Sequence, residues 1–308
     1  MGVNILSLCD GMSCCQIALD ELNINTNDYY ASEIDKYAIK VTQSNYPETV
    51  QLGDVTELGE EELKQLPKID LLIAGTPCKN LSRAVINRDN YNQGLEGEES
   101  KLFYDYARIL EWLKNNNNNK IKFVLENVNS MNDEDKNIIT DVLNVEPIMI
   151  NSKLTSAQDR KRYYWTNLHV ERKPEDENIV LKDVVLTAEK VNEIERNGRK
   201  NYWYEEDFEF HGSDKRVIAT LDINGHDILK RVYNLNSKAP TLTTCTGGNR
   251  EKKVYQNGWC RKLTPLEYER LQNVPEGYTD CVSATRRYNM LGNGFTIGVI
   301  KHILKNLK

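Results

Sequence analysis

The chain has 308 residues, 39% of them hydrophobic and 28% charged, and a formal net charge of −6 at pH 7. At roughly 150 residues per domain this length allows one large domain or two modest ones, and the composition suits a globular protein with a real core. The acidic balance excludes a protein that coats nucleic acid by bulk positive charge, but it leaves room for a local basic groove.

The sequence also disfavours membrane, secreted and disulfide-bonded classes. No stretch approaches the roughly 18 uninterrupted apolar residues of a transmembrane helix, so we expect no membrane span. Residues 1–7 lack a basic n-region and a cleavage site, which predicts no secretory signal. The seven cysteines include no CxxC pair, which favours reduced thiols in the cytoplasm and argues against structural zinc.

The first half of the chain alternates short apolar runs with amphipathic stretches. Strands are predicted at residues 4–8, 29–32, 69–74, 121–125, 147–150 and 163–165, and helices at 15–22, 37–44, 102–113 and 133–143. This alternation predicts an α/β fold whose open, mainly parallel sheet has helices on both faces. Ligands bind such sheets beyond the carboxyl ends of the strands, so the residues that follow each strand are the first functional candidates.

From about residue 168 the rhythm fades into polar sequence with turn signals. Between Arg196 and Lys262, thirteen Lys and Arg stand against eight Asp and Glu, a local positive excess in an acidic chain. Charge alone favours a nucleic-acid-binding surface and an ordinary solvated face about equally. Residues 291–307 return to helical periodicity.

Three strand ends carry residues suited to a nucleoside. The turn Asp10-Gly11-Met12 leads from the first strand into a helix, where Gly11 lets the backbone approach a ligand and helix N–H groups are free. Glu33 ends the second strand, where a carboxylate can accept hydrogen bonds from ribose hydroxyls, and Asp54 follows a third. These residues predict an adenosine site; helix capping is the alternative. The incomplete GxGxxG pattern argues against a dinucleotide.

Cys78 directly follows Gly75-Thr76-Pro77 at the end of the most apolar strand. Alone, a cysteine is more often a packed small side chain than a nucleophile. A rigid turn at a strand end favours the nucleophile, because helix-terminus N–H groups and nearby cations stabilise a thiolate. The polar residues 82–100 that follow are interpreted as a lid or, equally, a surface loop.

Glu126 and two arginines complete the candidate chemistry. Glu126 follows the strand at 121–125 and should share its sheet edge with Cys78, where a partly desolvated carboxyl can hold a proton or cap a helix. Arg160 and Arg162 lead into the strand at 163–165, so alternation predicts that both point to one face. Two guanidinium groups suit a phosphate or a carbonyl, and a structural ion pair explains them equally.

With these motifs in this order, the chain resembles the DNA (cytosine-5)-methyltransferases almost from end to end. The matching stretches are Leu6-Ser7-Leu8-Cys9-Asp10-Gly11, Ala31-Ser32-Glu33, Pro77-Cys78, Glu126-Asn127-Val128, residues 158–162, residues 261–272 and Leu291-Gly292-Asn293-Gly294-Phe295. Several stretches, including SLCDGMS and GYTDCVS, look most like the de novo type catalytic domain known from animal genomes.

The resemblance implies a Rossmann-like, S-adenosylmethionine-dependent methyltransferase fold with a mixed, mainly parallel sheet. It implies a catalytic domain at 1–167, a small target-recognition domain at 168–255 and a return to the catalytic domain at 256–308. S-adenosylmethionine is the implied cofactor, S-adenosylhomocysteine its product, and no metal is expected. The implied cofactor-binding residues are Cys9, Asp10, Gly11, Glu33, Ile34, Asp54, Val55, Pro77, Leu102, Asn293 and Phe295.

By the family scheme, the implied partner is double-stranded DNA and the catalytic residues are Cys78, Glu126, Arg160 and Arg162. A cytosine swings out of the duplex, and the Cys78 thiolate adds to its C6 atom. Glu126 supports N3 and the amino group, while Arg162 holds the carbonyl with Arg160 close by. The methyl group then transfers to C5, and closure of residues 82–100 excludes water.

Three positions depart from the commonest family pattern. Cys9 stands where many members have Phe, Ser13 replaces a frequent Gly, and Lys79 replaces the usual Gln or Asn. The first two would weaken cofactor binding, and none removes a catalytic group.

Two other functions stay open, and a nicotinamide dehydrogenase is a distant third. One is a catalytically silent DNA-binding regulator; the other is a tRNA cytosine-5 methyltransferase, although its Cys-Phe-Thr motif is missing from the sequence. We expect the cytoplasm of a bacterium or a viral host, with the protein on the nucleoid through DNA. A restriction partner and the oligomeric state stay open.

Overall fold

A computed structural model describes residues 2–77, 94–97, 101–116, 120–171, 173–198, 201–245 and 249–307. Its backbone contacts define two compact units. The first comprises Met1–Asn151, Lys161–Lys173 and Val299–Lys308, and the second Ser152–Arg160 and Pro174–Gly298. Each unit has its own sheet and its own hydrophobic core.

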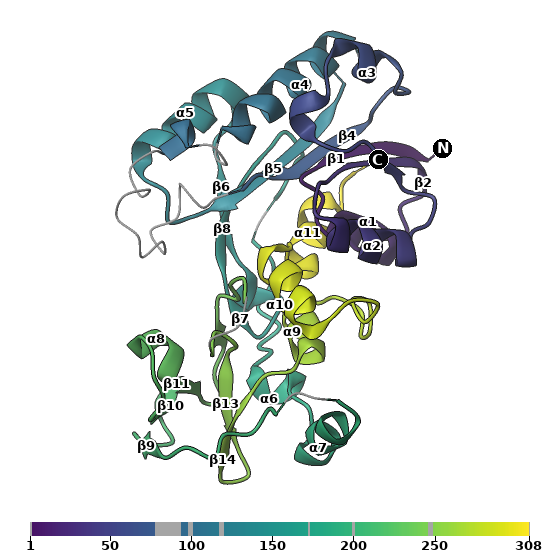
Figure 1. Cartoon of the computed structure of the whole chain (residues 1–308). Helices are drawn as coiled ribbons and strands as arrows, with labels where there is room; N and C mark the ends of the chain where they lie inside the picture. The colour runs from purple at the N-terminus through teal and green to yellow at the C-terminus, as the bar shows by residue number, and fades with distance from the viewer. Residues whose placement is uncertain are drawn as a thin grey trace. The chain divides into compact units, whose positions relative to one another are not determined.

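The first unit is built on a seven-stranded sheet in the order β3-β2-β1-β4-β5-β8-β6 (Figure 1). Its strands are β1 (Val3–Leu8), β2 (Thr26–Ser32), β3 (Val50–Gln51), β4 (Leu71–Gly75), β5 (Lys122–Val128), β6 (Ile148–Asn151) and β8 (Lys161–Thr166). The five strands from β3 to β5 pair in parallel, whereas β8 runs antiparallel to both β5 and β6. The predicted α/β fold with a mixed, mainly parallel sheet is confirmed.

Helices cover both faces of this sheet (Figure 1). They are α1 (Cys14–Glu21), α2 (Lys36–Asn45), α3 (Glu60–Lys64), α4 (Leu102–Asn116), α5 (Asp133–Leu143) and α11 (Ile297–Leu304), with short 3-10 turns η1 (Val55–Glu57) and η3 (Gly94–Glu96). Side chains fix several of their starts: the Asp35 carboxylate caps α2 and the Asn132 amide caps α5 by accepting from backbone N–H groups.

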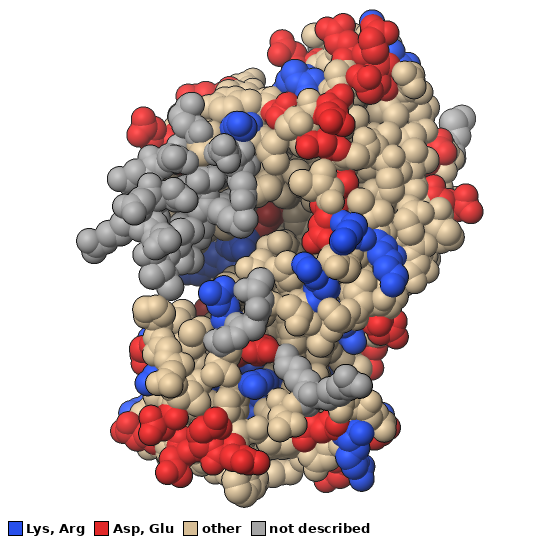
Figure 2. Space-filling model, viewed as in Figure 1, with Lys and Arg blue, Asp and Glu red and all other residues tan. Residues whose placement is uncertain are grey.

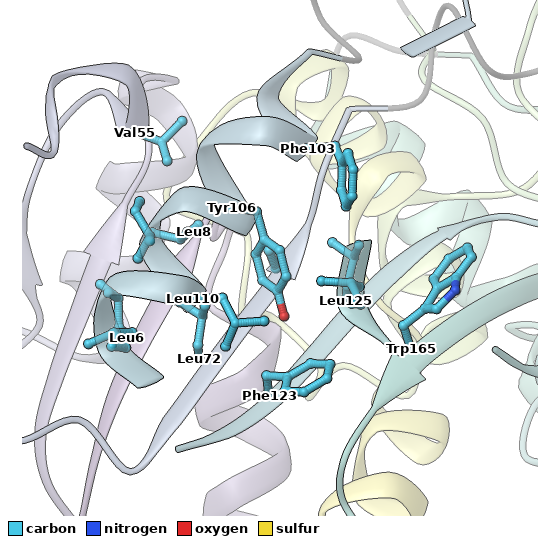
Figure 3. Packing of buried hydrophobic residues seen from close by; sticks show 14 of the residues in the cluster. Leu6, Leu8, Val55, Leu72, Phe103, Tyr106, Leu110, Phe123, Leu125 and Trp165 are labelled. Carbon is cyan, nitrogen blue, oxygen red and sulfur yellow. The ribbon is translucent and has the colours of Figure 1, made fainter. Parts of the chain in front are cut away.

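One core lies between the sheet and the helices α4 and α5 (Figure 3). Leu6, Leu72 and Phe123 from three strands pack against Tyr106 and Leu110 of α4. All five are at most 2% exposed, and burying such side chains stabilises the fold by about 1.5–3 kcal/mol each. Because helices cover both faces, the central strands are apolar along their length rather than alternating.

The second unit contains a five-stranded sheet in the order β14-β13-β11-β10-β9, and a two-stranded pair, β12-β7. Its strands are β7 (Gln158–Asp159), β9 (Phe208–Phe210), β10 (Val217–Leu221), β11 (Arg231–Tyr233), β12 (Ala239–Pro240), β13 (Lys253–Gln256) and β14 (Trp259–Lys262). Its helices are η4 (Ser152–Leu154), α6 (Leu181–Val184), α7 (Ala188–Asn197), α8 (Asp227–Lys230), α9 (Pro265–Leu271) and α10 (Ala284–Asn293).

The helical periodicity expected across residues 291–307 is interrupted. Helix α10 ends at Asn293, Gly294 is extended with φ −63° and ψ 161°, and α11 begins at Ile297. The Gly294 carbonyl accepts hydrogen bonds from the Arg160 and Gln272 side chains rather than from a following turn of helix. Side-chain donors from distant segments therefore take the place of the backbone N–H groups that a continuing helix would supply to this carbonyl.

None of the helices in the described part of the chain is both long and apolar enough to cross a membrane.

Candidate active site

The register of the parallel strands brings two candidate motifs together. At the carboxyl ends of β4 and β5, Gly75 pairs directly with Glu126. Cys78 follows Gly75 by three positions in the sequence. Cys78 and Lys79 lie outside the described residues, as does the predicted lid at 82–100 apart from residues 94–97.

A buried amide fastens the end of β4 to the end of β5. Asn127 Nδ2 donates to the Thr76 hydroxyl oxygen at 3.1 Å and to its carbonyl oxygen at 3.4 Å. Both side chains are buried, and the half-buried Pro77 follows at once. Sequence reasoning gave Asn127 no role; a polar amide directly after a buried strand is the signal that identifies it.

Glu126 is paired with Arg162. The Arg162 Nε atom lies 2.7 Å from Glu126 Oε1, with 12% and 10% of the two side chains exposed. The antiparallel pairing of β5 with β8 sets this contact, because Arg162 lies opposite Val128. A charge-assisted bond of this length orients the carboxylate, and the remaining exposure lets both groups reach a ligand.

The Arg160 side chain has different partners from that of Arg162. The prediction that both point to one face of a strand is wrong, because Arg160 lies between β7 and β8, outside both. Arg160 is only 3% exposed, and its guanidinium donates to the carbonyl oxygens of Leu242, Gly292 and Gly294 at 3.1–3.2 Å. These partners belong to the second unit, whereas Glu126 and Arg162 belong to the first.

The turn after β1 and the end of β2 form an open cradle. The Gly11 N–H donates to Glu33 Oε2 at 2.7 Å, and Glu33 Oε1 accepts from the Ile34 and Asp35 N–H groups at 2.8 Å. Gly11 has φ +63°, and a Cβ added there would meet nothing within 4 Å. Ile34 is 73% exposed, unusual for a large apolar side chain. A carboxylate for hydroxyl groups and an aliphatic surface for a ring fit a nucleoside.

Beneath this turn lies a buried carboxyl. Asp10 accepts hydrogen bonds from the Ser13 hydroxyl and, at 2.7 Å, from the Tyr29 hydroxyl. Burial raises the pKa of Asp10 to about 6. Ser13 has φ +59°, a region where glycine is favoured, so its bond to Asp10 offers a physical reason why a non-glycine residue is tolerated there. Sequence reasoning missed Tyr29, since its partner comes from another strand.

Cys9 also has a positive φ, +52°, and is half-buried. Burial is the main cause that raises the pKa of its thiol to about 12, so the side chain is neutral. Cys9 thus contributes a small uncharged group beside Asp10, and not a reactive thiolate.

The other predicted cofactor residues divide between the units. In the first, Asp54 caps η1 by accepting from the Thr56 N–H at 2.9 Å, Val55 is buried, and Leu102 begins α4 half-buried. In the second, Asn293 is exposed and Phe295 half-buried. The capping alternative for Asp54 is thus realised, although its second carboxylate oxygen accepts none of these bonds.

The positive excess between Arg196 and Lys262 is only partly a surface property. Lys253 and Arg261 are buried, and Arg231 forms an ion pair with Asp227. Figure 2 shows acidic side chains gathered over the part of the second unit where Figure 1 labels β9. The exposed residues Glu205, Glu206, Asp207 and Glu209 precede or belong to this strand. The excess therefore does not make one continuous basic face.

Within the described ranges, no group of three or more His, Cys, Asp or Glu side chains could hold a metal ion.

Comparison with known proteins gives one family. The model described as C-5 cytosine-specific DNA methylase matches residues 3–308. The type II methyltransferase M.HhaI of Haemophilus parahaemolyticus is 26% identical, covering 99% of this chain and 94% of that protein. M.SsoII of Shigella sonnei is 27% identical over 91% of this chain and 74% of its own length.

Two solved structures share the fold. The methyltransferase EhMeth of Entamoeba histolytica has a TM-score of 0.68 and 15% identity, with 100% of this chain and 99% of that chain covered. A DNMT2 mutant of Spodoptera frugiperda has a TM-score of 0.64 and 18% identity, with 99% of each chain covered.

Proposed function

Because the chain belongs to the C-5 cytosine-specific DNA methylase family, it is a DNA cytosine-5 methyltransferase, and we propose that it acts by covalent catalysis on a cytosine turned out of the duplex. The observation that carries this proposal is the Glu126–Arg162 pair at 2.7 Å, aligned through Gly75 with the turn that leads to Cys78. An acid and a cation at one sheet edge, and a thiol three positions after Gly75 in the sequence, are the groups that the reaction needs.

The proposed steps use Cys78, Glu126 and Arg162. The Cys78 thiolate adds to C6 of the cytosine, while Glu126 stabilises the ring at N3 and Arg162 binds the ring carbonyl. Electron density gained by C5 lets that carbon accept a methyl group. Loss of the C5 proton to a base then restores the double bond and expels the thiolate. The base has to leave the stack first, because C6 is not accessible inside a duplex.

The residues of the first unit fit S-adenosylmethionine. When bound, this cofactor supplies the methyl group from its sulfonium. Glu33 would bind the ribose hydroxyls, Ile34 would cover the adenine ring, and the open space at Gly11 would let the backbone approach the ligand. Asp54, with one carboxylate oxygen outside the η1 cap, would add an acceptor. Cys9, Asp10, Val55, Pro77, Leu102, Asn293 and Phe295 complete the proposed set.

Residues 168–255 would supply target recognition and residues 256–308 would return to the catalytic domain. The paired cations and the acidic cluster at β9 restrict which part of the second unit can face DNA. Arg250, which is exposed and close in the sequence to residues 246–248, is better placed to face DNA than the basic side chains near β9.

Transfer of labelled methyl groups from S-adenosylmethionine to unmethylated duplex DNA tests the proposal. We expect incorporation with wild type and with Cys281→Ala, a control at a partly exposed thiol, and none above background with Cys78→Ala. Activity in Cys78→Ala would refute covalent catalysis. Inactivity of the wild type on DNA would favour the silent regulator, and labelling of tRNA instead would favour the tRNA enzyme. Methylome sequencing of cells that express the chain would identify the target.

A further inference from the structure

Arg160 joins three segments of the second unit. It follows β7, and its guanidinium donates to the Leu242 carbonyl at 3.1 Å and to the Gly292 and Gly294 carbonyls at 3.2 Å. Leu242 lies in the segment 241–245, which continues into residues 246–248. Gly292 and Gly294 flank Asn293 at the end of α10.

The two segments also touch directly. A Cβ built on Gly292 would lie 2.5 Å from the carbonyl carbon of Thr243 and 2.7 Å from the Thr244 nitrogen. Both contacts are with backbone, so a side chain at this position would force the segments apart. Gly292 therefore serves close packing rather than an unusual φ.

Two glutamines, Gln158 and Gln272, join the same segments as Arg160. Gln158 accepts from the Leu242 N–H at 2.8 Å and donates to Gln272 Oε1 at 3.0 Å. Gln272 donates in turn to the Leu291 carbonyl at 2.7 Å and to the Gly294 carbonyl at 3.0 Å. Both glutamines and Arg160 are at most 3% exposed, so these bonds are shielded from water.

We propose that Arg160 is a positioning residue that makes segment 241–245 and the turn 292–294 move as one body, so that binding of the duplex and binding of the cofactor favour each other. This rests on the proposed function, in which Asn293 contributes to the cofactor site and the second unit binds DNA. Arg160, with its guanidinium directed at three carbonyls, acts through these segments and not on the cytosine.

Such coupling is reciprocal and measurable. If duplex tightens cofactor binding by a given factor, cofactor tightens duplex binding by the same factor. A coupling of this kind typically lies at about 5- to 150-fold. The wild-type factor follows from titrating S-adenosylhomocysteine into the protein alone and into its complex with the duplex that carries the target found by methylome sequencing.

Two variants and one matched control separate coupling from stability. Arg160→Met removes all three bonds, and Gly292→Ala separates the segments while Arg160 is retained. Arg216→Met is the control. Arg216 also donates to backbone carbonyls, those of Lys238 and Ala239 at 3.2 Å, and to the Asp159 carboxylate at 3.3 Å, but to none of residues 292–294. Thermal unfolding of all three shows whether each is folded at the assay temperature.

We expect a wild-type coupling factor of at least about fivefold, the same factor in Arg216→Met, and a factor near one in Arg160→Met and Gly292→Ala. A folded Arg160→Met that keeps the wild-type factor would overturn the proposal, as would a wild-type factor of one. A protein that binds no S-adenosylhomocysteine, or methylates no DNA, contradicts the proposed function instead.

Hydrogen exchange on the wild type needs no variant. Binding of S-adenosylhomocysteine alone, without DNA, should slow exchange of the backbone amides in 242–245 as well as those in 292–294. Slower exchange confined to 292–294 would show that the two segments respond independently and would overturn the proposal even if every variant unfolds.

Discussion

Arg162 Nε and Glu126 Oε1 are 2.7 Å apart because β5 and β8 run antiparallel and place the two side chains at the same edge. The strand pairing thus determines the contact between two of the proposed catalytic side chains. It joins a strand of the parallel part of the sheet to the antiparallel strand that follows it in sheet order.

The contributions of Glu126 and Arg162 to catalysis should depend on each other. We expect Glu126→Gln and Arg162→Met each to lower kcat by about 100-fold or more, since a positioned acid or cation contributes about that much. The double variant should lose far less than the product of the two losses, because each single change already disables its partner. Single-turnover rates on target duplex measure this.

The exposed ion pair Arg108–Asp105 in the same unit supplies the matched control, with 43% and 24% of its side chains exposed. Arg108→Met should leave the rate within about twofold, as expected for a surface pair. Multiplicative losses at Glu126 and Arg162 would show that the two residues act independently.

Glu33 should determine cofactor affinity and leave the chemical step nearly unchanged. Glu33→Gln removes a charged acceptor from the cradle and disturbs the bond from the Gly11 N–H. Hydrogen bonds to charged groups contribute about 1.5–3 kcal/mol, so the Kd for S-adenosylhomocysteine should rise by about 10- to 150-fold. Calorimetric titration measures it. Glu57→Gln, at an exposed carboxylate in η1, is the control; equal affinities for the two variants would remove Glu33 from the site.

The sequence was sufficient to place most of the first unit. Apolar runs such as residues 69–74 are typical of strands that helices cover on both faces. Helix α5 has the predicted bounds, Asp133–Leu143. The second unit was not predictable in this way, because its strands have at most five residues and some of them pair with strands far away in the chain. Periodicity carries no information about such pairing.

The same limit applies to the site. Glu33 and Gly11 come after the ends of β2 and β1, and Glu126 lies near the end of β5, so the order of a parallel sheet determines their placement. The hydrogen-bond partners of Arg160 could not be predicted. Leu242 and Gly292 are distant in the sequence and contribute only backbone carbonyls, which any residue type has. Alternation predicts a side chain's face only while the strand continues, and here it breaks at Arg160.

Asp10 should make the free protein less stable as pH rises. Burial raises its pKa from 3.8 to about 6, so the folded state favours the protonated carboxyl. This stabilisation is fully present below the unfolded-state pKa and is lost as pH rises through the folded-state pKa, a total of about 3 kcal/mol at 1.36 kcal/mol per pKa unit. Asp10→Asn lacks this titration.

Urea unfolding at several pH values without cofactor checks this prediction. Between pH 5 and pH 7.5 the wild type should lose about 1 kcal/mol more than Asp10→Asn. Asp28→Asn, at an exposed carboxylate, should follow the wild-type profile. Parallel profiles for wild type and Asp10→Asn would mean that Asp10 is ionised in the folded protein across this range.

The ion pair Arg261–Glu267 should be the most sensitive polar contact of the second unit. Both side chains are 0% exposed and 2.6 Å apart, and Glu267 also accepts from the Thr264 and Leu186 N–H groups. Glu267→Ala leaves a buried guanidinium without its counter-charge and the Thr264 and Leu186 N–H groups without an acceptor, so the free energy of unfolding should fall by about 3–5 kcal/mol. Urea unfolding of the complete chain, followed by tryptophan fluorescence, measures the change.

The exposed pair Arg231–Asp227 in the same unit is the reference, and Asp227→Ala should cost no more than about 1 kcal/mol. The double variant Arg261→Met/Glu267→Leu separates the effect of the unpaired charge on stability from the effect of lost packing. It removes both charges together, so it should recover part of the loss of Glu267→Ala, with the remainder due to the unpaired Thr264 and Leu186 N–H groups. A double variant that is less stable than Glu267→Ala would show that the contacts of Arg261 with Gln256 and the Leu186 carbonyl, and not its charge, stabilise this region.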